Sequence, residues 1–195
     1  MPGHGFVLAT LAAAVLGAAT PEAAVIPRTP DDLAITLASG KQVTLSQYKG
    51  KVVAVLFILT TCPHCQAAVQ CLIQDQHEFG PRGFQAIASA IEDQAQTSVP
   101  DFIRRFSPPF PVGYSGLKPS IDFMQHPPKE TAHMPLIAFI DRRGILRAQY
   151  EGMEPFFVEE RMAKNIHDTI AALMGGGGPA PKGKDVPKAA VQPKK

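Results

Sequence analysis

The sequence predicts an α/β domain with a central mixed sheet, flanking helices and a β-hairpin at its N-terminal end. Val52–Leu59 is an apolar run rich in β-branched side chains, which is typical of a strand buried on both faces. A segment of helical periodicity and a second apolar run, Phe84–Ile91, follow it and predict a parallel β-α-β unit. Short alternating segments before and after this unit predict antiparallel hairpins. The sheet should therefore contain both strand directions.

The residues ahead of this domain divide into two parts. Phe6–Ala19 is an apolar run of 14 residues, shorter than the ~20 needed to span a bilayer. It ends in small residues, as a signal-peptide cleavage site does, although Met1–Gly5 contains no Lys or Arg. We expect a signal peptide at residues 1–19 and a Pro-rich linker at residues 20–30. Export to the periplasm or another extracytoplasmic compartment would allow a disulfide to persist.

The elements of the expected globular domain, residues 31–174, follow from local patterns. Strands are expected at Leu33–Leu37, Gln42–Leu45, Val52–Leu59, Phe84–Ile91, Phe110–Tyr114, Leu136–Ile140 and Ile145–Tyr150. Helices are expected at Pro63–Phe79, Val99–Phe106 and Pro155–Met174, with one helical turn at Ser120–Gln125. Ser98-Val-Pro-Asp101 looks like a capping box that opens the second helix.

The C-terminal residues 175–195 are rich in Gly, Pro and Lys and predict a disordered tail. The tail carries a charge of +4 and the whole chain +2, so the remainder is mildly acidic at −2. A body of this charge offers no basic patch for nucleic acid. No membrane span is expected once the signal segment is removed.

The chemistry is predicted where the first buried strand meets the first helix, at Cys62-Pro63-His64-Cys65. A cysteine at a helix start lies near free backbone N–H groups and the positive end of the helix dipole, which stabilise a thiolate. Pro63 suits the first helical position because its missing N–H costs nothing there. Cys65 lies about one turn further on and can close a disulfide with Cys62. We therefore expect a redox-active pair in which Cys62 attacks and Cys65 resolves.

His64 lies between the two cysteines. As a cation, or as a hydrogen-bond donor to sulfur, it would favour the thiolate and stabilise the reduced form. Cys71 shares a helical stripe with small and apolar residues, which indicates a structural role. His126, His133 and His167 follow no ligand pattern and are expected at the surface. A second Cys-x-x-Cys or a His pair at ligand spacing is missing, so we expect no metal and no cofactor.

Two stretches make the chain resemble the thioredoxin superfamily. They are Leu37–Cys65 (LASGKQVTLSQYKGKVVAVLFILTTCPHC) and His133–Leu146 (HMPLIAFIDRRGIL). Within the superfamily the chain is similar to the TlpA/ResA-like, AhpC/TSA-related exported thiol-disulfide oxidoreductases, over about Asp31 to Leu173. The resemblance implies a thioredoxin-like fold and a redox-active disulfide.

The resemblance also implies roles for residues around the cysteines. The family's matching proline, Pro135 here, is cis and faces the disulfide, which leaves the backbone of Met134 free to pair with a substrate peptide. Thr61 replaces the family's tryptophan and is expected to contact substrate. The buried acid of thioredoxins corresponds to Leu56, so the proton acceptor for the resolving cysteine is unassigned. Glu92 is a candidate for it, although an exposed loop acid is the favoured interpretation.

The leading functional hypothesis is an exported thiol-disulfide oxidoreductase that exchanges mixed disulfides with protein thiols and a redox partner, as a monomer. The direction stays open, because CPHC resembles the motif of DsbA-type oxidants while the rest of the chain resembles a family that usually reduces. One alternative is a thiol peroxidase, although peroxiredoxins place Thr where Leu59 stands here. Another is a copper(I) module in which Cys62 and Cys65 are joined by Cys71 or His64.

Overall fold

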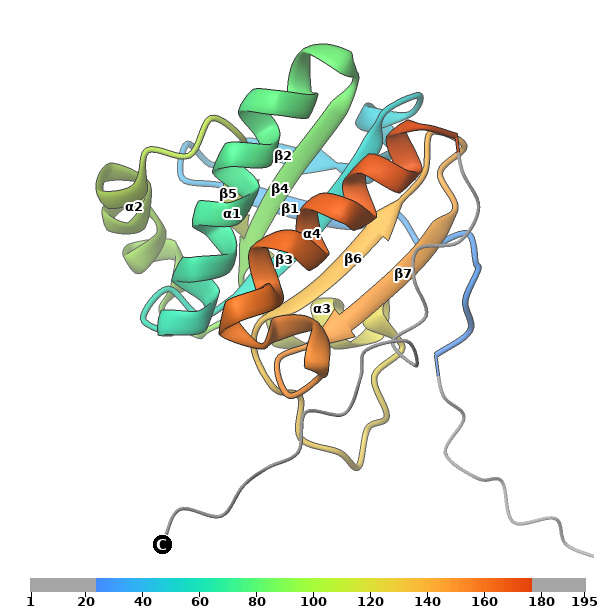
Figure 1. Ribbon diagram of the computed structural model, residues 1–195. Coiled ribbons are helices and arrows are strands. Elements are labelled where there is room, and N and C mark those ends of the chain that lie inside the picture. The colour runs from blue at the N-terminus through green and yellow to red at the C-terminus, as the bar shows by residue number, and fades with distance from the viewer. Residues whose placement is uncertain (1–23, 177–195) are drawn as a thin grey trace, which may run out of the picture.

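The computed structural model describes residues 24–176. The signal peptide expected at residues 1–19 and nearly all of the tail expected at residues 175–195 lie outside the described residues. The described residues form one mixed sheet with helices on both faces (Figure 1). This arrangement confirms the predicted fold class.

The sheet of the described part has seven strands, in the order β2-β1-β5-β4-β3-β6-β7. The strands are β1 (Ala34–Leu37), β2 (Gln42–Thr44), β3 (Val52–Ile58), β4 (Phe84–Ala90), β5 (Val112–Tyr114), β6 (Leu136–Ile140) and β7 (Leu146–Glu151). The α-helices are α1 (Pro63–Phe79), α2 (Ala95–Phe106), α3 (Leu117–Met124) and α4 (Glu159–Met174). Short 3-10 turns lie at Leu45–Tyr48, Gly80–Arg82 and Pro155–Phe157.

β3 is the central strand, and all of its residues are buried. It pairs in parallel with β4 and antiparallel with β6. The β3-α1-β4 crossover is the predicted parallel unit, and the β1-β2 and β6-β7 pairs are the predicted hairpins. The central position explains the continuous apolar run, because neither face of β3 meets water.

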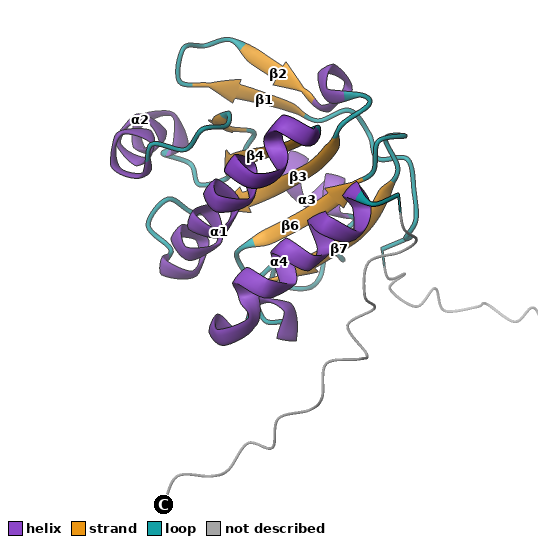
Figure 2. Ribbon diagram, turned by 45° about the horizontal axis from the view of Figure 1, so that its top comes forward, coloured by secondary structure: helices purple, strands orange, loops and turns teal. Residues whose placement is uncertain are grey.

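Alternate residues of β3 point into two separate cores. Leu56 and Ile58 pack under α1 and α4, while Val55 and Phe57 pack on the opposite face, where α3 lies. Figure 2 shows α1 and α4 side by side over one face of the sheet, with α3 behind it. Each fully buried large apolar side chain contributes about 1.5–3 kcal/mol, so β3 fixes both layers and with them the start of α1.

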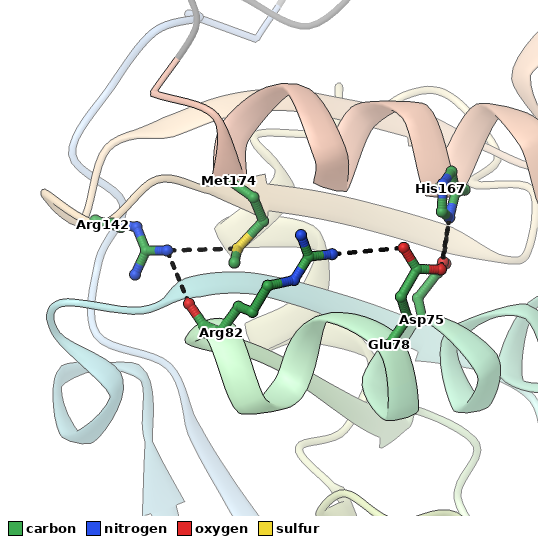
Figure 3. Close-up of polar contacts among 6 residues, drawn as sticks. All are labelled: Asp75, Glu78, Arg82, Arg142, His167 and Met174. Atoms are coloured by element: carbon green, nitrogen blue, oxygen red, sulfur yellow. Dashed lines mark hydrogen bonds and ion pairs between the residues drawn. The ribbon is translucent and has the colours of Figure 1, made fainter.

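Polar contacts tie α1 to α4, and tie the turn between β6 and β7 to α4 and to the 3-10 turn that follows α1 (Figure 3). Asp75, which is 4% exposed, accepts a hydrogen bond from Nδ1 of His167 over 2.9 Å. Arg142 donates to the Arg82 carbonyl over 3.0 Å and to the Met174 sulfur over 3.7 Å. His167 lies at the surface, with 40% of its side chain exposed, but the helices also bring it to a carboxylate 92 positions earlier in the chain.

Three helices differ from the prediction. α4 begins at Glu159 rather than at Pro155, because Pro155–Phe157 forms a separate 3-10 turn. α2 begins at Ala95 rather than at Val99, and Ser98 does not cap it, because the Ser98 hydroxyl donates to Oε1 of Glu92 over 3.0 Å. α3 spans Leu117–Met124 where one turn was expected. Pro119 does not prevent this helix because it lies in the first turn, where a backbone N–H has no intrahelical partner.

The N-terminal end of the described chain lies against the edge of the sheet. The backbone of Arg28 forms two hydrogen bonds with Leu146, at 3.2 and 2.8 Å. The Arg28 guanidinium also donates to the Phe123 carbonyl over 2.6 Å. None of the helices formed by residues 24–176 is long and apolar enough to cross a membrane.

Candidate active site

The turn between β3 and α1 holds the two predicted redox cysteines. Cys62 is the N-cap of α1, and Pro63 occupies the first helical position, as expected. The Cys62 amide donates to the Leu59 carbonyl over 3.0 Å, and the Cys62 carbonyl accepts from the Gln66 amide over 3.0 Å. These bonds close the turn on both sides and place the first cysteine at the positive end of the helix.

The two thiols differ in exposure. Cys62 is partly exposed, whereas Cys65 is fully buried and packs in the same core cluster as Leu56. Burial is the main cause that raises the pKa of the Cys65 thiol; the neighbouring Cys62 and the charge of Glu92 raise it further, while a backbone hydrogen bond from Leu59 opposes them. A division into an attacking thiol and a resolving thiol requires such a difference in exposure.

The Met134–Pro135 peptide bond is cis, the geometry that the resemblance implies. Pro135 is buried and directly precedes β6, whose Leu136 lies opposite Phe57 of β3. Continuing this register places Met134 and Pro135 beside the end of β3, next to the cysteine turn. Met134 is partly buried and packs against both cores.

Gly152 is a residue of this site that the sequence analysis missed. Its amide donates to the His133 carbonyl over 2.8 Å. A Cβ at this position would lie 2.3 Å from the Met134 carbonyl oxygen, so only glycine permits the observed approach. A lone glycine after a strand gives no sequence signal for such a contact, because its partner lies in a different loop.

Glu92 is not the exposed loop acid that the sequence analysis favoured. It follows β4, and its Oε1 accepts hydrogen bonds from the Thr60 amide at 3.1 Å, the Thr60 hydroxyl at 2.5 Å and the Ser98 hydroxyl at 3.0 Å. Its Oε2 is buried and has no hydrogen-bond partner among the described residues. The acid is drawn inward because parallel pairing of β3 with β4 brings the two strand ends together.

The remaining predicted residues take simpler positions. Thr61, Pro63 and His64 are exposed around Cys62, and within the described chain His64 has no hydrogen-bond partner. His133 is exposed, as expected. His126 is not a surface residue: its side chain is 9% exposed, and its ring nitrogens contact the Pro127 carbonyl at 3.1 Å and the Glu151 carboxylate at 3.2 Å.

Cys71 is half-buried and lies about 14 Å along α1 from Cys62 by the helical rise. It borders a hollow of about 270 Å³ between α1 and α4 that also includes Asp75, Glu78 and His167. Burial, and secondarily Asp75, raise the pKa of its thiol, so it is a poor nucleophile. Within residues 24–176 no three His, Cys, Asp or Glu side chains form a group that could hold a metal ion.

A larger hollow, of about 470 Å³, lies at the opposite end of β3, where Lys51, Val53 and Asp141 contribute to its lining. It is remote from the cysteine turn, where the partly exposed Cys62, the buried Cys65 and the cis Met134–Pro135 peptide bond lie close together.

The fold and these cysteines define a thioredoxin-like oxidoreductase. Residues 17–166 match the family described as Redoxin, and the chain belongs to this family. Among curated proteins it is similar to "Probable glutathione peroxidase 8-A" and "8-B" of Xenopus laevis, each 39% identical over 54 residues. That match covers 28% of this chain and 26% of each relative, so the chain spans about a quarter of the relatives' length.

Solved structures share the fold. A putative thiol:disulfide interchange protein DsbE from Chlorobium tepidum superposes with a TM-score of 0.62 at 23% identity, over 76% of this chain and 97% of that one. A thioredoxin family thiol:disulfide interchange protein from Chlorobium tepidum TLS gives 0.64 at 20% identity, over 78% and 100%. DsbF of MTB, in mixed oxidized and reduced forms, gives 0.58 at 15% identity, over 72% and 94%.

Proposed function

We propose that the chain exchanges disulfides with protein thiols through Cys62 and Cys65. The observation that carries this proposal is the pairing of a partly exposed thiol at a helix N-terminus with a buried thiol one turn further on. The adjacent cis Met134–Pro135 bond supports it, because the Met134 backbone would pair with an extended client peptide.

The reaction has two steps when the protein acts as a reductant. The Cys62 thiolate attacks a client disulfide, forms a mixed disulfide and expels one client sulfur as a thiolate, which takes up a proton. Cys65 then loses its proton, and its sulfur attacks Cys62. The bond between Cys62 and the client breaks, and the second client sulfur leaves as a thiolate. The reverse sequence oxidises a client dithiol.

The proposed setting is outside the cytoplasm, in the periplasm or an equivalent compartment, where such a pair can cycle with a redox partner protein. We propose that the chain acts as a monomer on protein clients. The printed names of the solved neighbours, which include thiol:disulfide interchange proteins, support the choice of reaction.

Two single substitutions test the proposed function. Cys65→Ser should accumulate mixed disulfides with client proteins, which migrate as higher-mass species on non-reducing gels and disappear with dithiothreitol. Cys62→Ser should form none and should lose all exchange activity, because only the attacking thiol begins the reaction. Full turnover by Cys65→Ser would overturn these roles. Cys71→Ser serves as the control and should behave like the parent.

A thiol peroxidase is the second candidate, because the curated relatives of the matched segment are named as probable glutathione peroxidases. Peroxide consumption coupled to a thiol reductant separates the two. We expect slow consumption compared with reduction of a protein disulfide, and the opposite order would favour the peroxidase.

A further inference from the structure

Glu92 carries a fixed negative charge at the end of β4. Burial works to raise the pKa of its carboxyl, but the hydrogen bonds from Thr60, from its own backbone and from Ser98 outweigh burial, and the pKa is lowered overall. Because the pKa of the carboxyl lies below its ordinary value of 4.5, the group is mostly ionised at pH 4.5 and above. Near neutral pH, Glu92 is an anion whose Oε2 is buried and accepts no hydrogen bond within the described chain.

A short segment of backbone links this anion to the resolving cysteine. Thr60, two residues after β3, donates its amide and hydroxyl to Glu92. Gln66, which follows Cys65, donates to the Thr60 carbonyl over 2.9 Å. Thr60 thus connects the carboxylate to the residue next to the buried thiol.

An anion held beside a buried thiol disfavours the thiolate, because the low local dielectric strengthens the repulsion. Glu92 has this effect on Cys65, in addition to the larger effect of burial. The lowered pKa of Glu92 also makes it a weak base, which is poorly matched to taking a proton from a thiol. Its position therefore favours repulsion over proton transfer.

We propose that Glu92 is a positioning residue that adds to the effect of burial in disfavouring the Cys65 thiolate and so slows the resolution of the mixed disulfide on Cys62. The inference rests on the proposed function and concerns the rate of its second step, the attack of Cys65 on the mixed disulfide. In that step Cys65 gives its proton to water, its sulfur bonds to Cys62, and the client thiolate leaves and takes up a proton. With Glu92 in place, the mixed disulfide persists longer.

The other ionisable groups around the pair come from three elements. Cys62 is the N-cap of α1 and His64 lies in its first turn, Asp93 follows Glu92, and His133 lies on the loop before β6. Of these, His64, Asp93 and His133 are exposed. Asp93→Asn is a matched control, because it removes the same charge from an exposed residue that is next to Glu92 in the chain. Thr60→Val is the second control, since it removes the hydroxyl bond and retains the charge.

The experiment is a stopped-flow reaction of the reduced protein with dithiobis(nitrobenzoate) in a Cys71→Ala background, so that two thiols react. Attack by Cys62 releases one coloured thionitrobenzoate, and resolution by Cys65 releases the second. Glu92→Gln should speed the second release about threefold for each pH unit by which the Cys65 pKa falls, since a tenfold gain in thiolate is partly offset by weaker nucleophilicity. The pH profile of this step should move to lower pH.

Asp93→Asn and Thr60→Val should leave the second step slow. If Glu92→Gln releases the second thionitrobenzoate no faster than the parent does, the inference is overturned. A slower release would indicate that Glu92 accepts the proton of Cys65. Equal acceleration in Thr60→Val would assign the effect to a loosened turn and also overturn it. If the parent releases no second thionitrobenzoate, the proposed function itself fails, which distinguishes the two failures.

Discussion

Replacing Gly152 with alanine should displace the Met134–Pro135 loop from the cysteine turn. An added Cβ would lie 2.3 Å from the Met134 carbonyl oxygen and 2.6 Å from its carbon, whereas real Cβ contacts stay at or above 3.0 Å. The loop must therefore move by at least 0.7 Å. A displacement of about 1 Å in a positioned reacting group can cost on the order of a hundredfold in rate.

The expected result is selective. Exchange between Cys62 and a peptide disulfide should slow by about tenfold to a hundredfold, because the client would lose its backbone partner at Met134. Reaction with dithiobis(nitrobenzoate) should keep its rate, since a small disulfide needs no such partner. Both rates are measured by stopped flow on the reduced protein.

Gly175→Ala is the matched control. A Cβ there makes ordinary contacts of 3.6 and 3.7 Å at the end of α4, away from the cysteine turn. An unchanged peptide rate in Gly152→Ala, with an unchanged melting temperature, would refute the assignment of Met134 to client binding. An equal loss with both disulfides would indicate a damaged fold instead.

Three further predictions concern His64, Asp75 and His167. His64→Ala should lower the reduction potential by a few tens of millivolts, where ~30 mV corresponds to ~1.4 kcal/mol; equilibration in glutathione buffers measures it, and an unchanged potential would remove the main support for an oxidant. Asp75→Asn should raise the melting temperature at pH 7. Burial raises the pKa of Asp75, against the opposing effect of His167. Above pH 3.8, the ordinary pKa of this group in the unfolded chain, the ionised carboxylate therefore lowers the stability of the folded protein. The gain in melting temperature on Asp75→Asn should shrink as the pH falls toward about 4. A gain that instead grows on acidification would contradict this sign. In the same thermal series, His167→Ala should lower the free energy of unfolding by about 1–3 kcal/mol, because it leaves a buried carboxylate without its partner.

The sequence predicts the β3-α1-β4 unit and the cysteine turn well because their signals are local. Val52–Leu59 is apolar throughout, and the helix start is marked by Cys62 and Pro63 within a few residues. The start of α2 carries no such mark: Gln94 makes no side-chain cap, so the pattern at Ser98 misleads.

The rest of the site depends on contacts between distant parts of the chain. Glu92 lies 32 positions from Thr60, and Gly152 meets a loop on the other side of the β6-β7 hairpin. Periodicity and composition describe which face of an element is apolar, but they do not identify which polar group a strand end will meet. These contacts become visible only when the register of the sheet is known.

The docked segment around Arg28 has a consequence for how the sheet meets other proteins. A free strand edge offers unpaired N–H and C=O groups to any passing extended chain and invites aggregation. At β7 the backbone of Arg28 occupies these groups at Leu146, and its guanidinium holds the segment to the end of α3. The opposite edge, β2, is only three residues long. An extended client peptide thus meets a partner already in place at Leu146 and only a short strand at β2, which agrees with the proposal that the cis-proline loop receives its backbone.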